Sequence, residues 1–172
     1  QQAITNQTKV IVVSHVVSST GLRMPVREIT ALARANGILS IIDGAQAAPH
    51  MPIDVRAIGC DFYALSSHKM FGPTGVGVLW GRFDLLDKMP PYQGGGEMIK
   101  SVTLDEIIYN DVPHKFEAGT PNIADVIAWK EAFLFINETG KDIMAGQIKS
   151  IITPIRRVKH LFFRMSFNII LI

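Results

Sequence analysis

The sequence predicts an α/β fold in which helices cover a mostly parallel β-sheet. Two patterns point to it: short apolar runs rich in β-branched residues, and a helical period of apolar residues between the first two runs. The composition agrees, because 48% of the 172 residues are hydrophobic and 19% are charged, which is the balance of a globular chain. This length suits one domain or a piece of a larger one.

The first part of the chain alternates strand and helix. The run Val10–Ser14 (VIVVS) predicts a strand buried on both faces. Pro25 then opens a helix whose apolar side chains recur at helical spacing, and Gly37 ends that helix. Residues 38–42 (ILSII) predict a second buried strand.

Two further strands and a long helix follow. Residues 62–65 predict a third strand, and residues 76–80 predict a fourth that glycines bracket. Paired prolines and three consecutive glycines make residues 84–112 loop-rich. Residues 125–138 predict a helix with an apolar face, which Gly140 ends. This rhythm of strands and helices favours a layered α/β architecture.

Composition and charge exclude several classes of function. Lys and Arg total 17 and Asp and Glu total 15, so a net charge of +2 gives no electrostatic argument for binding nucleic acid. The single cysteine excludes an internal disulfide framework and a multi-cysteine metal site, and it fits a reducing compartment. No apolar run is long enough to span a membrane, and no signal peptide is visible. We expect a cytoplasmic protein, or an organellar one if a transit peptide precedes Gln1.

The last segment differs from the rest. Residues 141–172 carry six basic residues and one acidic residue. We interpret this segment as the truncated or aberrant start of a second, smaller domain. A basic amphipathic segment lying on a membrane surface is the alternative interpretation.

Polar clusters follow three of the predicted strands, at the ends where open α/β sheets bind their ligands. Each residue has an ordinary explanation on its own: Asp43 as a helix N-cap, Lys69 as a solvated side chain, Ser66 and His68 as turn residues. No G-x-S-x-G elbow is present, so hydrolysis has weak support. The clusters are Ser14 with His15, residues 43–46 (DGAQ) and residues 66–69 (SSHK).

The combination of Asp43 and Lys69 is more informative than either residue. They lie 26 residues apart, after strands that should be adjacent. A carboxylate that keeps a pyridine nitrogen protonated and a lysine that forms an imine are the two groups that pyridoxal phosphate (PLP) chemistry requires. Ser66 and His68 lie close enough to Lys69 in sequence to hold a phosphate. The sequence therefore predicts a PLP site at this edge of the sheet.

Four motifs resemble one family. They are DGAQAAPHMPIDV at residues 43–55, CDFYALSSHKMFGPTGVGVL at residues 60–79, PPYQGGGEMI at residues 90–99 and FEAGTPN at residues 116–122. Together they resemble the group II, SufS/CsdA-like cysteine desulfurases, in the class V branch of the fold-type I PLP enzymes. The likeness covers less than half of a full-length member. It implies a three-layer large domain, of which residues 1–140 form the central part.

The resemblance implies roles at matching positions. Lys69 would form the covalent bond to PLP and later act as the base at the substrate α-carbon. Asp43 would pair with the pyridinium nitrogen, and Gln46 would hydrogen-bond the phenolic oxygen of the ring. Ser66 and His68 would bind the phosphate.

Other positions of the family pattern concern the dimer and the substrate. Thr120 would reach the phosphate bound by the partner subunit, so the resemblance implies a homodimer, and Glu97 would line the site near its interface. His15 belongs to the motif after the first strand and is expected to contact the cofactor. Members usually read H-x-S-N there, and Ser18 stands in place of the Asn, with fewer donors and a shorter reach. Ser67 replaces a common Gly.

The family reaction takes sulfur from L-cysteine, leaves L-alanine and passes the sulfur, as a persulfide, to an acceptor protein for iron–sulfur cluster assembly. The family's persulfide-forming Cys and substrate-binding Arg would lie beyond Ile172. Cys60, which precedes the third strand, is interpreted as a small buried hydrophobe. We therefore expect little or no turnover from these 172 residues alone. A selenocysteine lyase acting on L-selenocysteine, another class V enzyme and a non-catalytic remnant are the alternatives.

Overall fold

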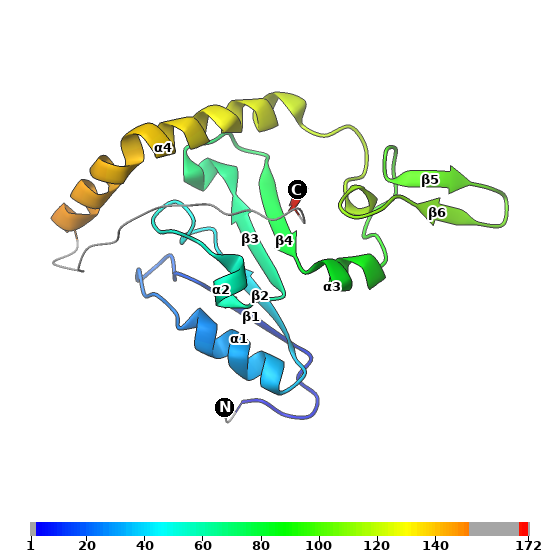
Figure 1. The fold of residues 1–172 in the computed structure, drawn as a ribbon, viewed down its shortest axis with the longest axis horizontal. Helices are drawn as coiled ribbons and strands as arrows, with labels where there is room; N and C mark the ends of the chain where they lie inside the picture. Colours follow the sequence, from blue (N-terminus) through cyan, green and yellow to red (C-terminus); the bar gives the residue numbers. More distant parts are fainter. Residues whose placement is uncertain (1–2, 152–168, 172) are drawn as a thin grey trace.

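The computed structural model describes residues 3–151 and 169–171 (Figure 1). It has the α/β character that the sequence predicts. In chain order the elements are β1 (Val10–Ser14), α1 (Val26–Ala35), β2 (Leu39–Asp43), α2 (Val55–Ile58), β3 (Phe62–Ser66), the 3-10 turn η1 (Ser67–Met70), β4 (Gly77–Gly81), α3 (Phe83–Lys88), β5 (Ile99–Val102), β6 (Ile107–Tyr109), the 3-10 turn η2 (His114–Phe116), α4 (Ile123–Ile151) and β7 (Ile169–Leu171).

Within the described residues the main sheet has five strands in the order β1-β2-β3-β4-β7. The pairs β1–β2 and β2–β3 are parallel, whereas β3–β4 and β4–β7 are antiparallel. Four strands therefore run in one direction and β4 runs against them, which confirms the mostly parallel sheet. The parallel register pairs Ser14 with Asp43 and Asp43 with Ala64, so β1, β2 and β3 end at the same edge.

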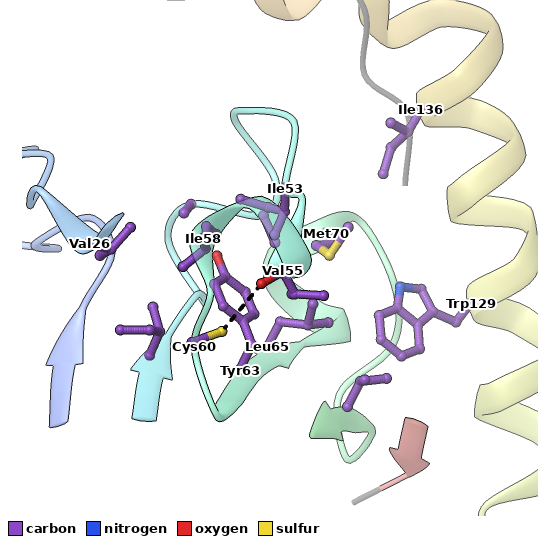
Figure 2. Close-up of a cluster of buried hydrophobic side chains, with 14 of the residues drawn as sticks. Val26, Ile53, Val55, Ile58, Cys60, Tyr63, Leu65, Met70, Trp129 and Ile136 are labelled. Carbon is purple, nitrogen blue, oxygen red and sulfur yellow. Dashed lines mark hydrogen bonds between the residues drawn. The ribbon is translucent and has the colours of Figure 1, made fainter. Parts of the chain in front are cut away.

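The main core lies on one face of the sheet, beneath α1, α2 and α4. Alternate strand residues point into it, among them Ile42, Tyr63 and Leu65. Figure 2 shows Trp129 and Ile136 projecting from α4 toward this cluster. On the other face, a smaller cluster packs Phe62 against Leu86 of α3, with Ile41, Leu79, Leu85, Val112 and Phe116 around it. Helices therefore contact both faces, giving three layers.

The prediction that the first strand is buried on both faces is wrong. β1 is an edge strand of the described sheet, with Val10 43% and Val12 68% exposed. The side of β1 that carries Val13 packs against the main core. On the other face of the sheet, α3 packs against β2, β3 and β4 and does not reach β1. A β-branched run thus indicates a strand without deciding how many of its faces are covered.

Two other expectations are corrected. Residues 84–112 are not only loop, because they hold most of α3 and the β5–β6 hairpin. Gly140 does not end the long helix, because α4 continues to Ile151. One glycine inside a helix costs only about 1 kcal/mol relative to alanine, which a long helix tolerates.

The segment 141–172 lies largely outside the described residues, so its assignment to a second domain stays a prediction, as does its membrane-surface alternative. Within the described part of the chain no helix is long and apolar enough to span a membrane.

A polar network links Ser40, Asp61 and Arg82 at the edge of the sheet opposite the carboxyl ends of β1, β2 and β3. Buried Asp61 accepts hydrogen bonds through Oδ2 from the Ser40 backbone N–H at 2.8 Å and the Ser40 hydroxyl at 2.9 Å. Its Oδ1 accepts a third from Arg82 at 2.9 Å. The buried carboxylate is therefore both paired and hydrogen-bonded, as burial of a charge requires.

Candidate functional site

The carboxyl ends of β1, β2 and β3 are joined beyond the strands by backbone hydrogen bonds. The N–H of His15 donates to the Asp43 carbonyl, and the N–H of Gly44 donates to the Ala64 carbonyl, each at 2.8 Å. These bonds hold the turns after β1 and β2 to the neighbouring strands. The polar clusters predicted from the sequence therefore share one edge of the sheet, where open α/β folds bind ligands.

Asp43 is the last residue of β2, and its side chain is exposed. Its Oδ1 accepts from the Ala45 N–H at 2.9 Å, while the Gly44 carbonyl accepts from Ala47 and Ala48 as the chain turns. Asp43 thus does form a local turn bond. In the described part of the chain this bond occupies only one carboxylate oxygen, so Oδ2 is left for a ligand. Gln46 lies in the same turn and is half-buried.

Lys69 lies in η1, directly after β3. Lys69 and His68 are exposed, Ser66 is half-buried, and Ser67 is fully buried. Ser67 closes the loop that follows: its N–H donates to the Val76 carbonyl at 3.0 Å and its hydroxyl donates to the Pro73 carbonyl. Ser67 therefore anchors the turn that carries Lys69.

Helix α4 packs against the loop after Lys69. A Cβ added at Gly72 would lie 2.5 Å from Trp129 Cδ1, so no side chain fits there. Phe71 has a φ of 60°, in the left-handed region, and contacts Phe135 edge-to-face at 5.9 Å between ring centroids. The orientation of the Lys69 turn therefore depends on a helix that begins more than fifty residues later in the chain.

Beneath the Asp43 turn lies a buried pair that sequence reasoning missed. Nδ1 of His15 is 3.0 Å from the Tyr63 hydroxyl, and the two rings meet at 87°. His15 is 3% exposed and Tyr63 is 1% exposed. Burial, together with the charge of Arg23, lowers the pKa of His15 to about 4, and burial raises the pKa of Tyr63. Both groups are neutral near pH 7. Nothing in the sequence signals this pair, because an aromatic residue inside a strand does not show which distant side chain its hydroxyl contacts.

The remaining candidates lie on loops. Thr120 is exposed in the segment before α4, where the Gly119 N–H donates to the Gly96 carbonyl at 2.9 Å. Glu97 is exposed and has a φ of 67°. Ser18 is exposed in the turn after β1. The roles of these three positions toward a partner subunit or a substrate stay predictions.

Cys60 is the buried hydrophobe that the sequence predicted. It is 2% exposed, and burial raises the pKa of its thiol to about 12. A thiol with so high a pKa forms almost no thiolate near neutral pH, and the thiolate is the reactive form. Within the described residues no three His, Cys, Asp or Glu side chains group to hold a metal ion.

The structure thus brings an amine, a carboxylate and hydroxyl, imidazole and amide groups to one edge of an α/β sheet. Comparison with known proteins identifies the family to which this fold belongs. The model of the aminotransferase class-V family matches residues 1–157. A protein of Xylella fastidiosa (strain 9a5c) named "Probable cysteine desulfurase" is 50% identical over 137 residues, which are 80% of this chain and 33% of that protein. The chain belongs to the aminotransferase class-V family, a family of PLP-dependent enzymes.

Solved structures agree with this family. The crystal structure of the cysteine desulfurase CsdA (S-sulfonic acid) from Escherichia coli matches with a TM-score of 0.82 and 35% identity, over 87% of this chain and 38% of that one. The structure of SspA in complex with cysteine matches with a TM-score of 0.61 and 26% identity, over 76% of this chain and 34% of that one. The chain spans about a third of the length of the curated relatives it matches.

The residues present fit PLP by the chemistry of their donors. A primary amine, Lys69, follows β3, and a carboxylate with an oxygen to spare, Asp43, ends the neighbouring strand β2. Ser66 and His68, beside the amine, carry a hydroxyl and an imidazole, which are groups that can donate to a phosphate. PLP carries an aldehyde, a pyridine nitrogen and a phosphate. Lys69 would bind the aldehyde, Asp43 the protonated nitrogen, and Ser66 with His68 the phosphate.

Proposed function

We propose that this chain is part of a PLP-dependent cysteine desulfurase, which converts L-cysteine to L-alanine and passes the sulfur as a persulfide to an acceptor protein for iron–sulfur cluster assembly. The observation that carries the proposal is that Asp43 ends β2 while Lys69 lies in the turn after the adjacent parallel strand β3. It is supported by a fold shared with CsdA and by sequence identity of about one half to proteins named as cysteine desulfurases.

The residues of this chain divide the work. Bound PLP would supply the electron sink that stabilises negative charge at the substrate α-carbon. The Asp43 carboxylate holds a proton on the pyridine nitrogen, since an adjacent negative charge favours the protonated form. Ser66 and His68 donate hydrogen bonds to the phosphate, and Gln46 donates one to the phenolic oxygen. The Lys69 amine holds the cofactor and, once released, accepts and returns a proton.

The wider assembly is also part of the proposal. Thr120 contacts the phosphate in the partner subunit of a homodimer, and Glu97 lies near that interface. His15 contributes to cofactor binding from the edge beside Asp43. Residues 1–140 belong to the large domain and residues 141–172 begin a smaller one. A reducing, cytoplasmic setting suits a chain whose single cysteine is a buried free thiol.

The test adds PLP to the purified chain and follows its visible absorption band. Treatment with borohydride then fixes the adduct for mass spectrometry. Lys69→Ala should abolish the band and the adduct at position 69, whereas Lys88→Ala, at an exposed lysine of α3, should leave both unchanged. Asp43→Ala should leave cofactor that binds but is poorly activated. A native chain that forms no Lys69-dependent band would overturn the proposal.

A further inference from the structure

A hydrogen bond crosses beneath β2 from one neighbouring strand to the other. Tyr63 belongs to β3, and His15 follows the last residue of β1. Since β2 lies between these strands, the bond from the Tyr63 hydroxyl to His15 Nδ1 passes under the end of β2, where Asp43 lies. It joins the ends of β1 and β3 through side chains, whereas the backbone bonds from His15 to Asp43 and from Gly44 to Ala64 join β2 to both neighbours.

The turn after Asp43 rests directly on the Tyr63 ring. A Cβ added at Gly44 would lie 1.9 Å from Tyr63 Cε1 and 2.4 Å from its hydroxyl oxygen. Only a residue without a side chain fits between this ring and the turn, because real Cβ contacts are never so short. The position of the ring therefore fixes how far the Asp43–Gly44 backbone can approach the core.

The pair is built to stay neutral and in place. Both side chains are almost fully buried, and buried polar groups are retained at low cost only when they are hydrogen-bonded. Besides burial, Arg23 lowers the pKa of His15, and Cys60 and Asp43 raise the pKa of Tyr63. The reach of the Asp43 charge to Tyr63 agrees with the ring lying under the turn that carries the carboxylate.

We propose that Tyr63 is a positioning residue: its hydroxyl, held by His15, sets the Asp43 turn so that the free carboxylate oxygen meets the nitrogen of a pyridine cofactor. This inference rests on the proposed function and adds a residue to it. Tyr63 acts through Gly44 and the Asp43 backbone and does not itself touch the cofactor. His15, on this view, contributes to the site through Tyr63.

The test is PLP binding by the purified chain carrying Tyr63→Phe, which removes only the hydroxyl. Tyr109→Phe is the matched control, because Tyr109 lies in the β5–β6 hairpin, outside the sheet that holds the site. Two quantities are measured: the PLP dissociation constant, and the pH midpoint of the visible band of bound PLP. The melting temperature without PLP is recorded for each variant.

Tyr63→Phe should weaken PLP binding about fivefold, because an Asp43 turn that the hydroxyl no longer fixes must be ordered when the cofactor binds. It should also move the pH midpoint of the band upward. A pyridine nitrogen that is protonated less often repels the proton on the Lys69 nitrogen less, so that proton is lost at a higher pH. A merely structural role lowers the melting temperature without moving that midpoint. Tyr109→Phe should change neither quantity.

A second pair of variants covers the case in which Tyr63→Phe does not fold. His15→Asn keeps a polar group facing the Tyr63 hydroxyl and should bind PLP within about twofold of the native chain, whereas His15→Leu should lose about fivefold. Equal binding by these two variants, or a folded Tyr63→Phe with native affinity and midpoint, would overturn the inference alone. A native chain without a Lys69-dependent band overturns the proposed function and the inference together.

Discussion

Lowering the pH should destabilise the fold through His15. Burial, with a contribution from Arg23, lowers the pKa of this imidazole from 6.5 to about 4 in the folded chain. The unfolded chain binds the proton more readily than the folded chain does. His15 therefore contributes its full stability above pH 6.5 and loses that contribution as the pH falls from 6.5 toward 4.

The magnitude follows from the size of the shift. Each unit of difference between folded and unfolded pKa is worth ~1.4 kcal/mol. The lowering of the His15 pKa from 6.5 to about 4 therefore corresponds to about 3 kcal/mol of unfolding free energy lost on full protonation. That is a large fraction of the roughly 5–15 kcal/mol by which folded domains are stable.

The assay is urea unfolding of the purified chain, followed by tryptophan fluorescence at pH 7.0, 5.5 and 4.5. His15→Asn removes the titrating group, so its unfolding free energy should fall less than that of the native chain over this range. His50→Asn, at an exposed histidine, should follow the native chain. The reasoning is refuted if His15→Asn loses as much stability on acidification as the native chain does.

Three further substitutions test the packing around the site. Gly72→Ala should destabilise the chain by about 1–3 kcal/mol in urea unfolding, because its Cβ would lie 2.5 Å from the Trp129 ring; a loss below about 0.5 kcal/mol would contradict this packing. Asp61→Ala should lower the unfolding free energy by roughly 3 kcal/mol, since it leaves the buried N–H and hydroxyl of Ser40 without an acceptor, and unchanged stability would refute that network. Thr30→Val should lower stability by about 1 kcal/mol, because it removes the 2.6 Å hydrogen bond from the Thr30 hydroxyl to the Ile58 carbonyl. An unchanged melting temperature would refute this contribution.

The strands and the candidate site were predictable because their signals are local. A β-branched run such as Val10–Ser14 marks a strand directly, and it is found with the same bounds. Asp43 ends β2 and Lys69 lies in the turn that follows β3, so parallel pairing of those strands was enough to place both at one edge. The family followed from motifs around these residues, and the class-V match confirms it.

The features that sequence reasoning missed depend on contacts between distant segments. The bond between Tyr63 and His15 joins residues 48 positions apart, and neither residue type predicts its partner. The exposure of Val12 depends on which elements cover the outer face, and the strand pattern does not contain that information. The extension of α4 past Gly140 reflects a helix propensity that one glycine lowers only slightly.

The absence of a side chain at Gly44 couples this turn position to Tyr63 of β3. Because an added Cβ would overlap the Tyr63 ring, position 44 accepts a methyl group only if position 63 becomes smaller. Substitutions at the two positions are then compensatory: each harms the chain alone, and a double-mutant cycle should give a coupling energy of about 1–3 kcal/mol. A chain that lacks the ring at position 63 has room for a side chain at position 44, whereas a chain that keeps the ring does not.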